Sequence, residues 1–430
     1  MRMIQRRGFL FGSAAAAAGT LAMKSALAET VTLPAANAAA RASDANYWAA
    51  VQDLYEVDRS IANLENGYWG IMARPVMETY IEQTQRVNRQ NSVYARSGFG
   101  KDFDDVRNRL AAAAGVLPEE IALTRGATEA LQILISGYNK LQPGDTILYS
   151  DLDYDSMQYA MKALQGRRGV ELKTFSIPEP ATREAVLAAY RTVLDETPKA
   201  KLLLLTHLSH RTGLVMPVRE IADMARAKGV DVIVDAAHSW GQIPFGAGDL
   251  GADFVGFNLH KWIGAPVGMG FFYIRKGRLA DIDVHMGDED WPADDIRSRA
   301  HTGTLNFAAA LSVPAALDLH EQIGSPAKHA RLSYLRDYWV GKVRSIGTLE
   351  ILTPDDASMH AGITSFRVKG KTGKDDNNAI VARLRDEFKV LTVRRAGVTN
   401  GQCIRVSPAL YTTETELDRL VAALTTVAAS

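Results

Sequence analysis

Short apolar runs alternate with helix-forming segments between Ile121 and Ile274, and this alternation constrains the fold more than any other feature of the chain. The predicted strands are Ile121–Thr124, Thr146–Tyr149, Lys201–Thr206, Val232–Val234, Phe254–Phe257 and Gly270–Ile274. Strands that are apolar throughout are typical of sheets buried on both faces, whereas half-exposed strands alternate between apolar and polar residues. We therefore expect an α/β domain in which helices cover both faces of a mainly parallel sheet.

A different pattern begins near residue 310. Two long helical segments, Phe307–Gln322 and Ala327–Ile346, lead into short separate strands and helices. The strands are expected at Gly362–Val368 and Ile404–Ser407, and the helices at Asn378–Glu387 and Glu414–Thr425. The pattern predicts a smaller α+β domain. We place the large domain at 61–315 and the small C-terminal domain at 316–430, and leave open a contribution of the N-terminal segment to the small domain.

Charge and cysteine content exclude several classes of function. The chain has 430 residues and a formal net charge of +0, which argues against a nucleic-acid or membrane-surface partner. Its one cysteine, Cys403, excludes an internal disulfide framework and a cysteine-clustered metal site. No metal site is predicted. A low cysteine content also suits an oxidising compartment.

The N-terminal residues are typical of a bacterial export signal. A twin-arginine segment, Arg6-Arg7-Gly8-Phe9-Leu10, precedes an Ala-rich apolar stretch and an A-x-A-type cleavage site at Ala26-Leu27-Ala28. We expect residues 1–28 to be a cleaved Tat signal peptide, with the Tat translocon as a partner during export and the periplasm as destination. An N-terminal extension follows at 29–60, and we expect its first part, about 29–45, to be flexible. The alternatives are a disordered leader or a short membrane anchor, although no segment of the chain reaches the ~20 apolar residues of a stable membrane span. Because the Tat route carries folded proteins, it favours a cofactor enzyme without identifying the cofactor.

Two residues at the ends of predicted strands are candidates for catalysis. Lys261, in Asn258-Leu259-His260-Lys261-Trp262, follows a buried strand at the edge where open α/β sheets bind ligands. A lysine forms an imine only as the free amine, which partial desolvation favours. Asp235 ends another buried strand, and a pyridinium N–H would pair with its carboxylate. The alternatives are a surface lysine and a helix N-cap aspartate.

A turn of small residues precedes a predicted helix in Thr124-Arg125-Gly126-Ala127-Thr128-Glu129-Ala130. Free backbone N–H groups at such a helix start bind phosphate, and Thr128 would add a hydroxyl group. A simple helix cap is the alternative, because threonine-rich caps are abundant. The three segments occur in an order that allows them to converge on one ligand, so together they are more specific than any one of them.

These segments resemble the class V aminotransferase family of fold type I pyridoxal-phosphate (PLP) enzymes, and within it the isopenicillin-N-epimerase-like branch. The similar motifs are 123–131, Asp235-Ala236-Ala237-His238, 258–262 with 268–270, and Arg405-Val406-Ser407-Pro408 with 411–413. The resemblance covers roughly residues 60–425. It implies a large domain with a mainly parallel seven-stranded sheet, a smaller C-terminal α+β domain, PLP as cofactor, and a homodimer with shared active sites.

The resemblance also implies roles for individual residues. Lys261 would hold PLP as a Schiff base and move a proton at the substrate Cα, and Asp235 would pair with the pyridine nitrogen. The other implied cofactor-binding residues are Gly126, Ala127, Thr128, Tyr154, His238, His260 and, reaching the partner subunit, Thr304. The implied substrate-binding residues are Arg405 for a carboxylate, the loop residues Asn66, Tyr68 and Trp69, and His210. A packed core position for Tyr154, a structural ion pair for Arg405 and simple packing of the loop aromatics are the alternatives.

The chain departs from the family pattern in two places. Ser209-His210-Arg211 replaces a Ser-Asn pair common in the family, which predicts an altered contact near the cofactor or substrate. Cys403 lies in or beside the strand of the Arg405 motif, whereas cysteine desulfurases of the family need a cysteine on a mobile loop. Sulfur transfer is therefore not expected.

Three hypotheses for function remain open at this stage. The first is an exported PLP enzyme that acts on a substrate with free amino and carboxyl groups, an amino acid or a peptide-linked glutamate. It is similar in export and motifs to the enzymes that convert a glutamate side chain to succinamide in the siderophore pyoverdine. The second is a periplasmic aminotransferase or amino-acid epimerase. The third is a non-catalytic exported α/β binding protein.

Overall fold

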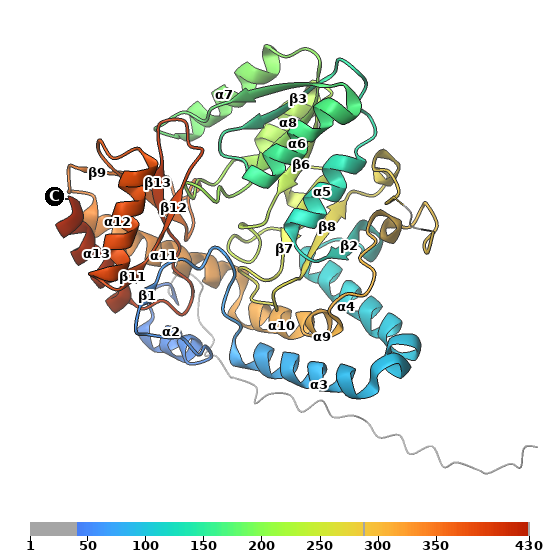
Figure 1. Cartoon of the computed structure of the whole chain (residues 1–430), viewed down its shortest axis with the longest axis horizontal. Helices are drawn as coiled ribbons and strands as arrows, with labels where there is room; N and C mark the ends of the chain where they lie inside the picture. The colour runs from blue at the N-terminus through green and yellow to red at the C-terminus, as the bar shows by residue number, and fades with distance from the viewer. Residues whose placement is uncertain (1–40, 287–288, 429–430) are drawn as a thin grey trace, which may run out of the picture. The chain divides into compact units, whose positions relative to one another are not determined.

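A seven-stranded sheet forms the centre of the large domain in the computed structural model, which describes residues 41–286 and 289–428 (Figure 1). The strands are β2 (Ile121–Thr124), β3 (Thr146–Ser150), β4 (Glu171–Phe175), β5 (Ala200–Thr206), β6 (Asp231–Asp235), β7 (Phe254–Asn258) and β8 (Gly270–Ile274). Their order is β2-β8-β7-β6-β5-β3-β4, and β8 runs antiparallel to both of its neighbours while the other strands are parallel. The predicted mainly parallel, seven-stranded sheet is confirmed.

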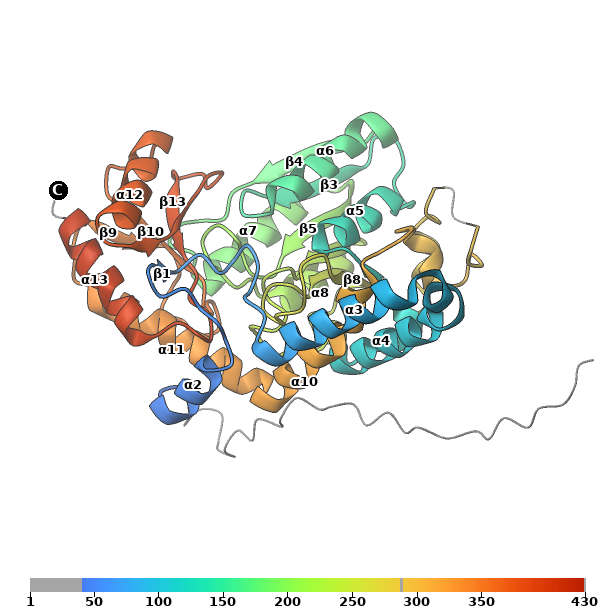
Figure 2. The same ribbon diagram turned by 60° about the horizontal axis from the view of Figure 1, so that its bottom comes forward.

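Helices cover both faces of this sheet. They are α3 (Arg74–Ser97), α4 (Phe99–Ala114), α5 (Ala127–Gly137), α6 (Asp155–Arg168), α7 (Arg183–Asp195), α8 (Val218–Ala227), α9 (Phe307–Leu311) and α10 (Val313–Ile323). On β5, Leu202 and Leu204 pack in the core with α5 and α6, whereas Leu203 and Leu205 pack on the opposite face with α4, α7 and α8. Figure 2 shows α3, α4 and α10 together along one side of the domain. Burial on both faces explains why β5 is apolar at successive positions.

The sequence reading missed β4 and the helices α6 and α7. Strand β4 lies at the edge of the sheet, and its residues Glu171–Phe175 are partly or fully exposed, so they form no apolar run. Helix α6 buries Met157, Met161 and Leu164, a spacing of four and three residues that does indicate a helix.

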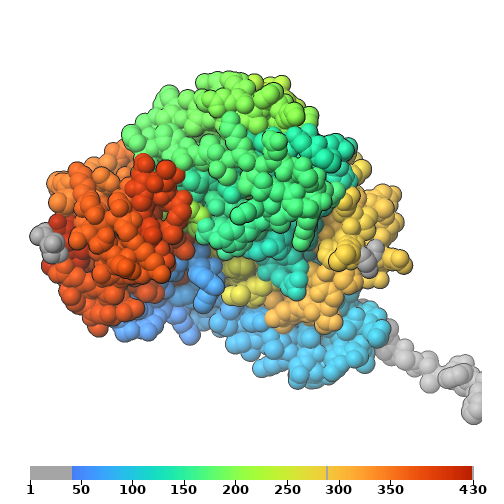
Figure 3. Space-filling view, turned by 45° about the horizontal axis from the view of Figure 1, so that its top comes forward, coloured from blue at the N-terminus to red at the C-terminus, as the bar shows by residue number. Residues whose placement is uncertain are grey.

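The C-terminal domain has its own sheet and core. Strands β9 (Leu349–Ile351), β10 (Thr364–Val368), β12 (Val393–Arg395) and β13 (Cys403–Val406) form an antiparallel sheet in the order β12-β13-β10-β9. Helices α11 (Ser325–Val343), α12 (Lys374–Asp386) and α13 (Glu414–Ala428) complete the domain, and Trp339 and Phe366 lie in its core. Figure 3 shows this domain, in orange and red, beside the green surface of the large domain. The predicted smaller α+β domain is confirmed.

An N-terminal segment belongs to the C-terminal core. Strand β1 (Ala62–Asn63) pairs in parallel with β11 (Val390–Leu391), and Ala62 and Leu64 pack in the same core as Trp339. The large-domain core includes Leu317 of α10 and continues into the C-terminal part of the chain with Leu352, Met359, Val398 and Cys403. The predicted boundary at 315 stays a prediction, and the contribution that the sequence left open comes from residues 62–64.

The predicted signal peptide, residues 1–28, and the first part of the predicted extension, up to residue 40, lie outside the described residues. The described part includes helix α2 (Ala45–Gln52), whose first turn is capped by the carboxylate of Asp44. Among residues 41–286 and 289–428, no helix combines the length and the apolar character needed to cross a membrane.

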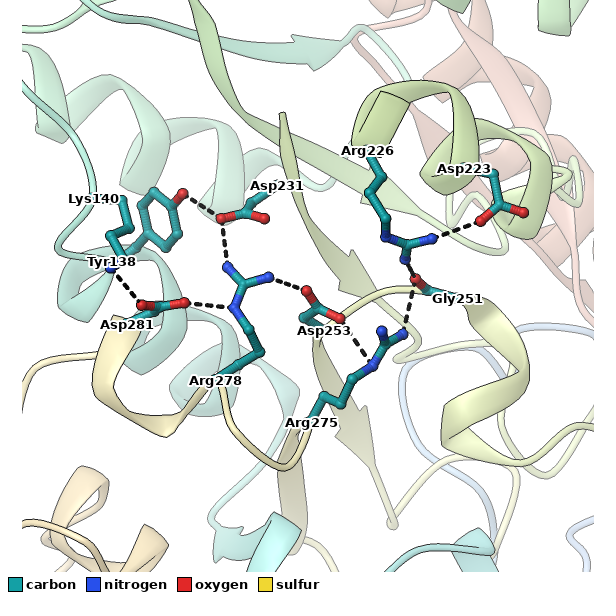
Figure 4. A network of polar contacts seen from close by, with 10 residues as sticks. All are labelled: Tyr138, Lys140, Asp223, Arg226, Asp231, Gly251, Asp253, Arg275, Arg278 and Asp281. Carbon is teal, nitrogen blue, oxygen red and sulfur yellow. Dashed lines mark hydrogen bonds and ion pairs between the residues drawn. The ribbon is translucent and has the colours of Figure 1, made fainter. Parts of the chain in front are cut away.

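A polar network joins the starting ends of β6 and β7 to the residues that follow β8 (Figure 4). The guanidinium of Arg278 pairs with Asp231, which begins β6, and with Asp253, which precedes β7. Arg275 also pairs with Asp253, at 2.9 Å, and the hydroxyl of Tyr138 donates to Asp231 at 2.6 Å. The network therefore lies at the edge of the sheet opposite to the carboxyl ends of the parallel strands.

Candidate active site

A cavity of about 460 Å³ lies at the carboxyl ends of the parallel strands, a size that suits a small ligand. Most residues implied by the motifs line it together: Tyr68, Gly126, Ala127, Thr128, Tyr154, His210, Asp235, His238, His260, Lys261 and Arg405. They come from both domains and from loops distant in sequence. The fold therefore brings these residues to one place, whatever role each has.

Lys261 is half-buried in the loop after β7. Its Nζ lies 3.0 Å from Nε2 of His238. Burial lowers the pKa of Lys261 to about 8, while the carboxylate of Asp235 acts in the opposite direction. The loop is fixed by the N–H of Gly70, which donates to the carbonyl of His260 at 2.9 Å. A Cβ at Gly70 would lie 2.3 Å from the carbonyl oxygen of Lys261, so only glycine fits there.

Asp235 is buried at the end of β6. Its Oδ1 accepts a hydrogen bond from the N–H of Ala237 at 2.9 Å. Burial raises the pKa of this carboxyl group, and the positive charge of Lys261 opposes the rise. Among the described residues, no second donor to this carboxylate is found, which leaves an oxygen free for an N–H of a ligand in the cavity.

The start of α5 forms a cradle for an anion. The N–H of Ala127 donates to the side-chain oxygen of Asn258 at 2.8 Å, so it is already in use. In the described part of the chain, the N–H groups of Thr128 and Glu129 have no protein acceptor, as is usual in the first turn of a helix. The backbone N–H groups of Thr128 and Glu129 are therefore the ones that remain for a ligand at this helix start. Asn258, which accepts from Ala127, was not among the predicted site residues.

Two glycines make room for this cradle. Gly126 has φ 156°, and a Cβ there would lie 3.1 Å from the side-chain oxygen of Asn258 and 3.3 Å from the ring of His260. A Cβ at Gly270 would lie 2.5 Å from the Cα of Gly126. Strand β8 and the start of α5 therefore approach each other more closely than side chains would allow.

The histidines of the cavity are neutral near pH 7. Burial lowers the pKa of His260 to about 4 and holds the pKa values of His210 and His238 well below the usual range. Nδ1 of His260 lies 3.1 Å from the carbonyl of Met269. These rings therefore act as hydrogen-bonding groups without adding positive charge to the cavity.

Tyr154 and His210 form one wall of the cavity. Their rings meet edge to face, with centroids 5.0 Å apart. Tyr154 is 36% exposed and precedes the first residue of α6. This position is fixed by Asp153, a fully buried carboxylate that accepts hydrogen bonds from the backbone N–H groups of Ser150, at 2.7 Å, and Thr206, at 2.8 Å. Asp153 thus connects the ends of β3 and β5 and sets where the Tyr154 ring lies.

An arginine pair reaches the cavity from the C-terminal domain. Nη2 of Arg405 lies 2.6 Å from Oε1 of Glu65, and its Nη1 donates to the carbonyl of His210 at 2.9 Å. Arg395 lies 3.4 Å from the same Glu65 oxygen. Burial, followed by the charge of Arg405, lowers the pKa of Arg395 to about 10.

Arg395 also was not predicted. Strand β12 pairs with β13 so that Arg395 lies opposite Cys403 and Val393 opposite Arg405. Because directly opposite residues in antiparallel strands share a face, Arg395 and Arg405 project from the same face of this pair. The sequence Val393-Arg394-Arg395 shows no alternation of apolar and polar residues, and all three residues are half-buried, so no local pattern indicated this position.

Three predicted residues lie outside the cavity lining. Asn66 is buried and holds its loop, since its Oδ1 accepts from the hydroxyl of Tyr411 at 2.7 Å and its Nδ2 donates to the carbonyl of Ser407 at 2.9 Å. Trp69 is 51% exposed and packs edge to face on Tyr68. Thr304 is exposed, and its contact with a partner subunit stays a prediction.

In Ser209-His210-Arg211, where the chain departs from the family pattern, His210 and Arg211 have different surroundings. His210 lines the cavity, whereas Arg211 is fully buried and forms an ion pair with Asp155 of α6. Gly397 packs directly on the Arg211 guanidinium, and a Cβ at Gly397 would overlap it. Arg211 therefore connects α6, which begins directly after Tyr154, to the C-terminal domain.

Among residues 41–286 and 289–428, no cluster of three or more potential metal ligands is found.

Comparison with known proteins identifies related chains. The profile of a family described as "Aminotransferase class-V" matches residues 72–420. The chain is 27% identical over 394 residues to isopenicillin N epimerase from Streptomyces clavuligerus, covering 88% of this chain and 97% of that one. An apo cysteine desulfurase from Thermococcus onnurineus NA1 has a similar structure, with a TM-score of 0.74 and 21% identity over 87% of this chain and 96% of that one. A mutant of C-DES with glycine covalently linked to its PLP cofactor gives a TM-score of 0.73 and 24% identity, over 85% of this chain and 96% of that one.

The lowered pKa of Lys261 predicts an unusual pH dependence for its reaction with aldehydes in the protein without a bound ligand. The rate should rise with pH around a midpoint near 8, because burial favours the free amine, whereas exposed lysines generally titrate at roughly 10.4. Asp235→Asn should move the midpoint to lower pH, since the Asp235 charge favours the ammonium form. Borohydride trapping and peptide mass spectrometry measure the rate, with the exposed Lys201 as internal reference. An upward shift in Asp235→Asn would contradict the assigned electrostatics.

Proposed function

The chain belongs to the class V aminotransferase family, and on that premise we propose that it is an exported PLP enzyme that acts on the amino group of an amino acid or a peptide-linked glutamate. The observation that carries the proposal is the position of the Lys261 Nζ, 3.0 Å from Nε2 of His238, in one cavity with Asp235 and with the first residues of α5. The family resemblance inferred from the motifs is confirmed by the match over residues 72–420.

The residues present fit PLP at three points. Lys261 offers an amine that loses its proton more readily than an ordinary lysine, and Asp235 offers a buried carboxylate oxygen to the pyridine N–H. The N–H groups of Thr128 and Glu129, next to the space left by Gly126 and Gly270, suit a phosphate. When bound, PLP supplies an electron sink that makes bonds at the substrate Cα easier to break.

The chain's own residues supply the remaining work. The amine of Lys261 moves a proton to or from Cα, and Nε2 of His238, at 3.0 Å, fixes where that amine lies. Arg405 binds the substrate carboxylate from the C-terminal domain. Tyr154 and His210 cover one side of the cavity and limit the access of water.

The finer proposal is tailoring of a siderophore, in which a peptide-linked glutamate becomes succinamide as in pyoverdine. The step releases the α-carboxyl group as CO2 and needs molecular oxygen as oxidant, so that RCH(NH2)COOH and O2 give RCONH2, CO2 and water. The predicted export signal and the motifs of the isopenicillin-N-epimerase-like branch support it. Sulfur transfer fits less well, because Cys403 is fully buried and burial raises the pKa of its thiol to about 11. Amino-acid epimerisation is the second candidate, favoured by the 27% identity to isopenicillin N epimerase over nearly the whole length of that enzyme.

The purified protein should be yellow with bound PLP, and borohydride should fix the cofactor on Lys261. Peptide mass spectrometry after reduction locates the adduct. Lys328 provides an internal control, because it is buried and burial lowers its pKa to about 7, yet its Nζ donates to the carbonyl of Trp262 at 2.7 Å and does not line the cavity. An adduct on Lys328, or one that persists in Lys261→Ala, would show that the cofactor-binding lysine is misassigned.

Export should depend on the twin arginines. The double substitution Arg6→Lys, Arg7→Lys keeps the positive charge and should retain the protein in the cytoplasm, since the Tat route reads the arginine pair. Fractionation of a bacterial host with and without a working Tat translocon measures this, and N-terminal sequencing should show loss of residues 1–28. Equal periplasmic amounts of both forms would remove the Tat assignment.

Deletion of the gene should change the mass of the secreted siderophore if the tailoring proposal holds. Purified protein should convert the glutamate-bearing precursor and leave free glutamate largely unchanged. Incubation in deuterated water distinguishes the second candidate, because epimerisation introduces deuterium at Cα while the amino group is retained. An unchanged siderophore mass together with deuterium at Cα of a free amino acid would favour the epimerase over the tailoring enzyme.

A further inference from the structure

Two arginines at the cavity share one carboxylate that lies outside the cavity lining. Arg395 and Arg405 line the cavity, whereas Glu65 does not. Oε1 of Glu65 contacts both guanidinium groups, at 2.6 Å to Arg405 and 3.4 Å to Arg395, and its Oε2 is buried without a partner. Glu65 thus acts as a counter-ion fixed beside the two arginines.

The other charges of the lining cancel in pairs. Among the described residues that line the cavity, Arg125 pairs with Glu129 at 2.6 Å, and the charge of Lys261 is opposed by that of Asp235. His210, His238 and His260 are neutral because burial lowers their pKa values. Arg395, Arg405 and Glu65 therefore form a group with a single excess positive charge. A cofactor phosphate would be held by the N–H groups at the start of α5, which are not part of this group.

Both guanidinium groups still have N–H groups to offer a ligand. Nη2 and Nη1 of Arg405 direct one N–H each, toward Glu65 and the carbonyl of His210 respectively, and its Nε has no partner among the described residues. Nη1 of Arg395 has no acceptor in the described part of the chain, and Arg395 faces the same cavity. A carboxylate that enters the cavity would therefore meet Arg395 as well as the predicted Arg405.

We propose that Arg395 and Arg405 bind one substrate carboxylate together, and that Glu65 makes the site selective for amino acids whose second carboxyl group is absent or amide-linked. This inference rests on the proposed function. One excess positive charge is neutralised by one carboxylate, so a second carboxylate would enter a cavity without a matching cation. Glu65 is the specificity-determining residue, because its loss would leave two unmatched arginine charges.

Binding of two matched ligands to the PLP-loaded protein tests the inference by calorimetry. Glutarate carries two carboxylates, whereas its monoamide carries one and has nearly the same shape, and neither has an amine that could react. The wild-type protein should bind the monoamide about 10-fold more tightly than glutarate, which corresponds to about 1.4 kcal/mol. Glu65→Gln should abolish or reverse this preference, and high salt should reduce it.

Three further variants show whether charge causes the effect. Glu65→Gln combined with Arg395→Gln restores a single excess charge, so the preference for the monoamide should return. Glu321→Gln removes an exposed glutamate that pairs with Arg109 far from the lining, and it should leave both affinities unchanged. If Glu65→Gln does not fold, Arg395→Gln alone should weaken binding of both ligands. Unchanged relative affinities in folded Glu65→Gln, or unchanged affinities in Arg395→Gln, would overturn the inference.

The outcome is separable from that of the proposed function. A protein that forms the borohydride-stable adduct on Lys261 but does not distinguish the two ligands refutes only the role of Glu65. A protein that forms no adduct refutes the proposed function, whichever ligand it prefers.

Discussion

Parallel alignment of the strands is the constraint on which the rest of the site depends. Because β5, β6 and β7 run in the same direction, their carboxyl ends and the loops that follow meet at one edge. Asp235 and Lys261 reach the cavity only through this alignment. The antiparallel β8 brings Gly270 against Gly126 at the same edge, so the start of α5 is held beside them. A sheet of another topology would scatter these groups.

Burial then determines the chemical character of the groups that meet there. Removal from water favours neutral forms, so the amine of Lys261 deprotonates more readily and the cavity histidines remain uncharged. Asp235 keeps a hydrogen bond from Ala237, which partly offsets its desolvation. The remaining net charge of the cavity comes from the C-terminal domain, where Arg395 and Arg405 meet Glu65. The large domain thus supplies Lys261 and Asp235 to the cavity, and the small domain supplies its two arginines.

The sequence predicted the features that rest on local patterns. The apolar runs located six of the seven strands, and the motif spacing located Lys261, Asp235 and the turn at Gly126. Edge strand β4 was missed because its exposure removes the apolar run. Arg395, Asn258 and Glu65 were missed for another reason, because their importance depends on contacts between segments far apart in the chain. Conversely, Asn66 was expected to touch a ligand, and only the hydrogen bonds to Tyr411 and Ser407 reveal that its amide is occupied.

The polar network around Arg278 lies at the edge of the sheet opposite to the cavity. It fastens the starting ends of β6 and β7 and thereby holds the register of the strands independently of the residues at their other ends. Substitutions beside the cavity can therefore alter which molecule is accepted without loosening the sheet that carries them. When the contacts that hold the sheet and the residues that line the cavity are separate, related proteins can change their substrate while the backbone stays nearly constant. Solved structures of only 21% and 24% identity share this fold.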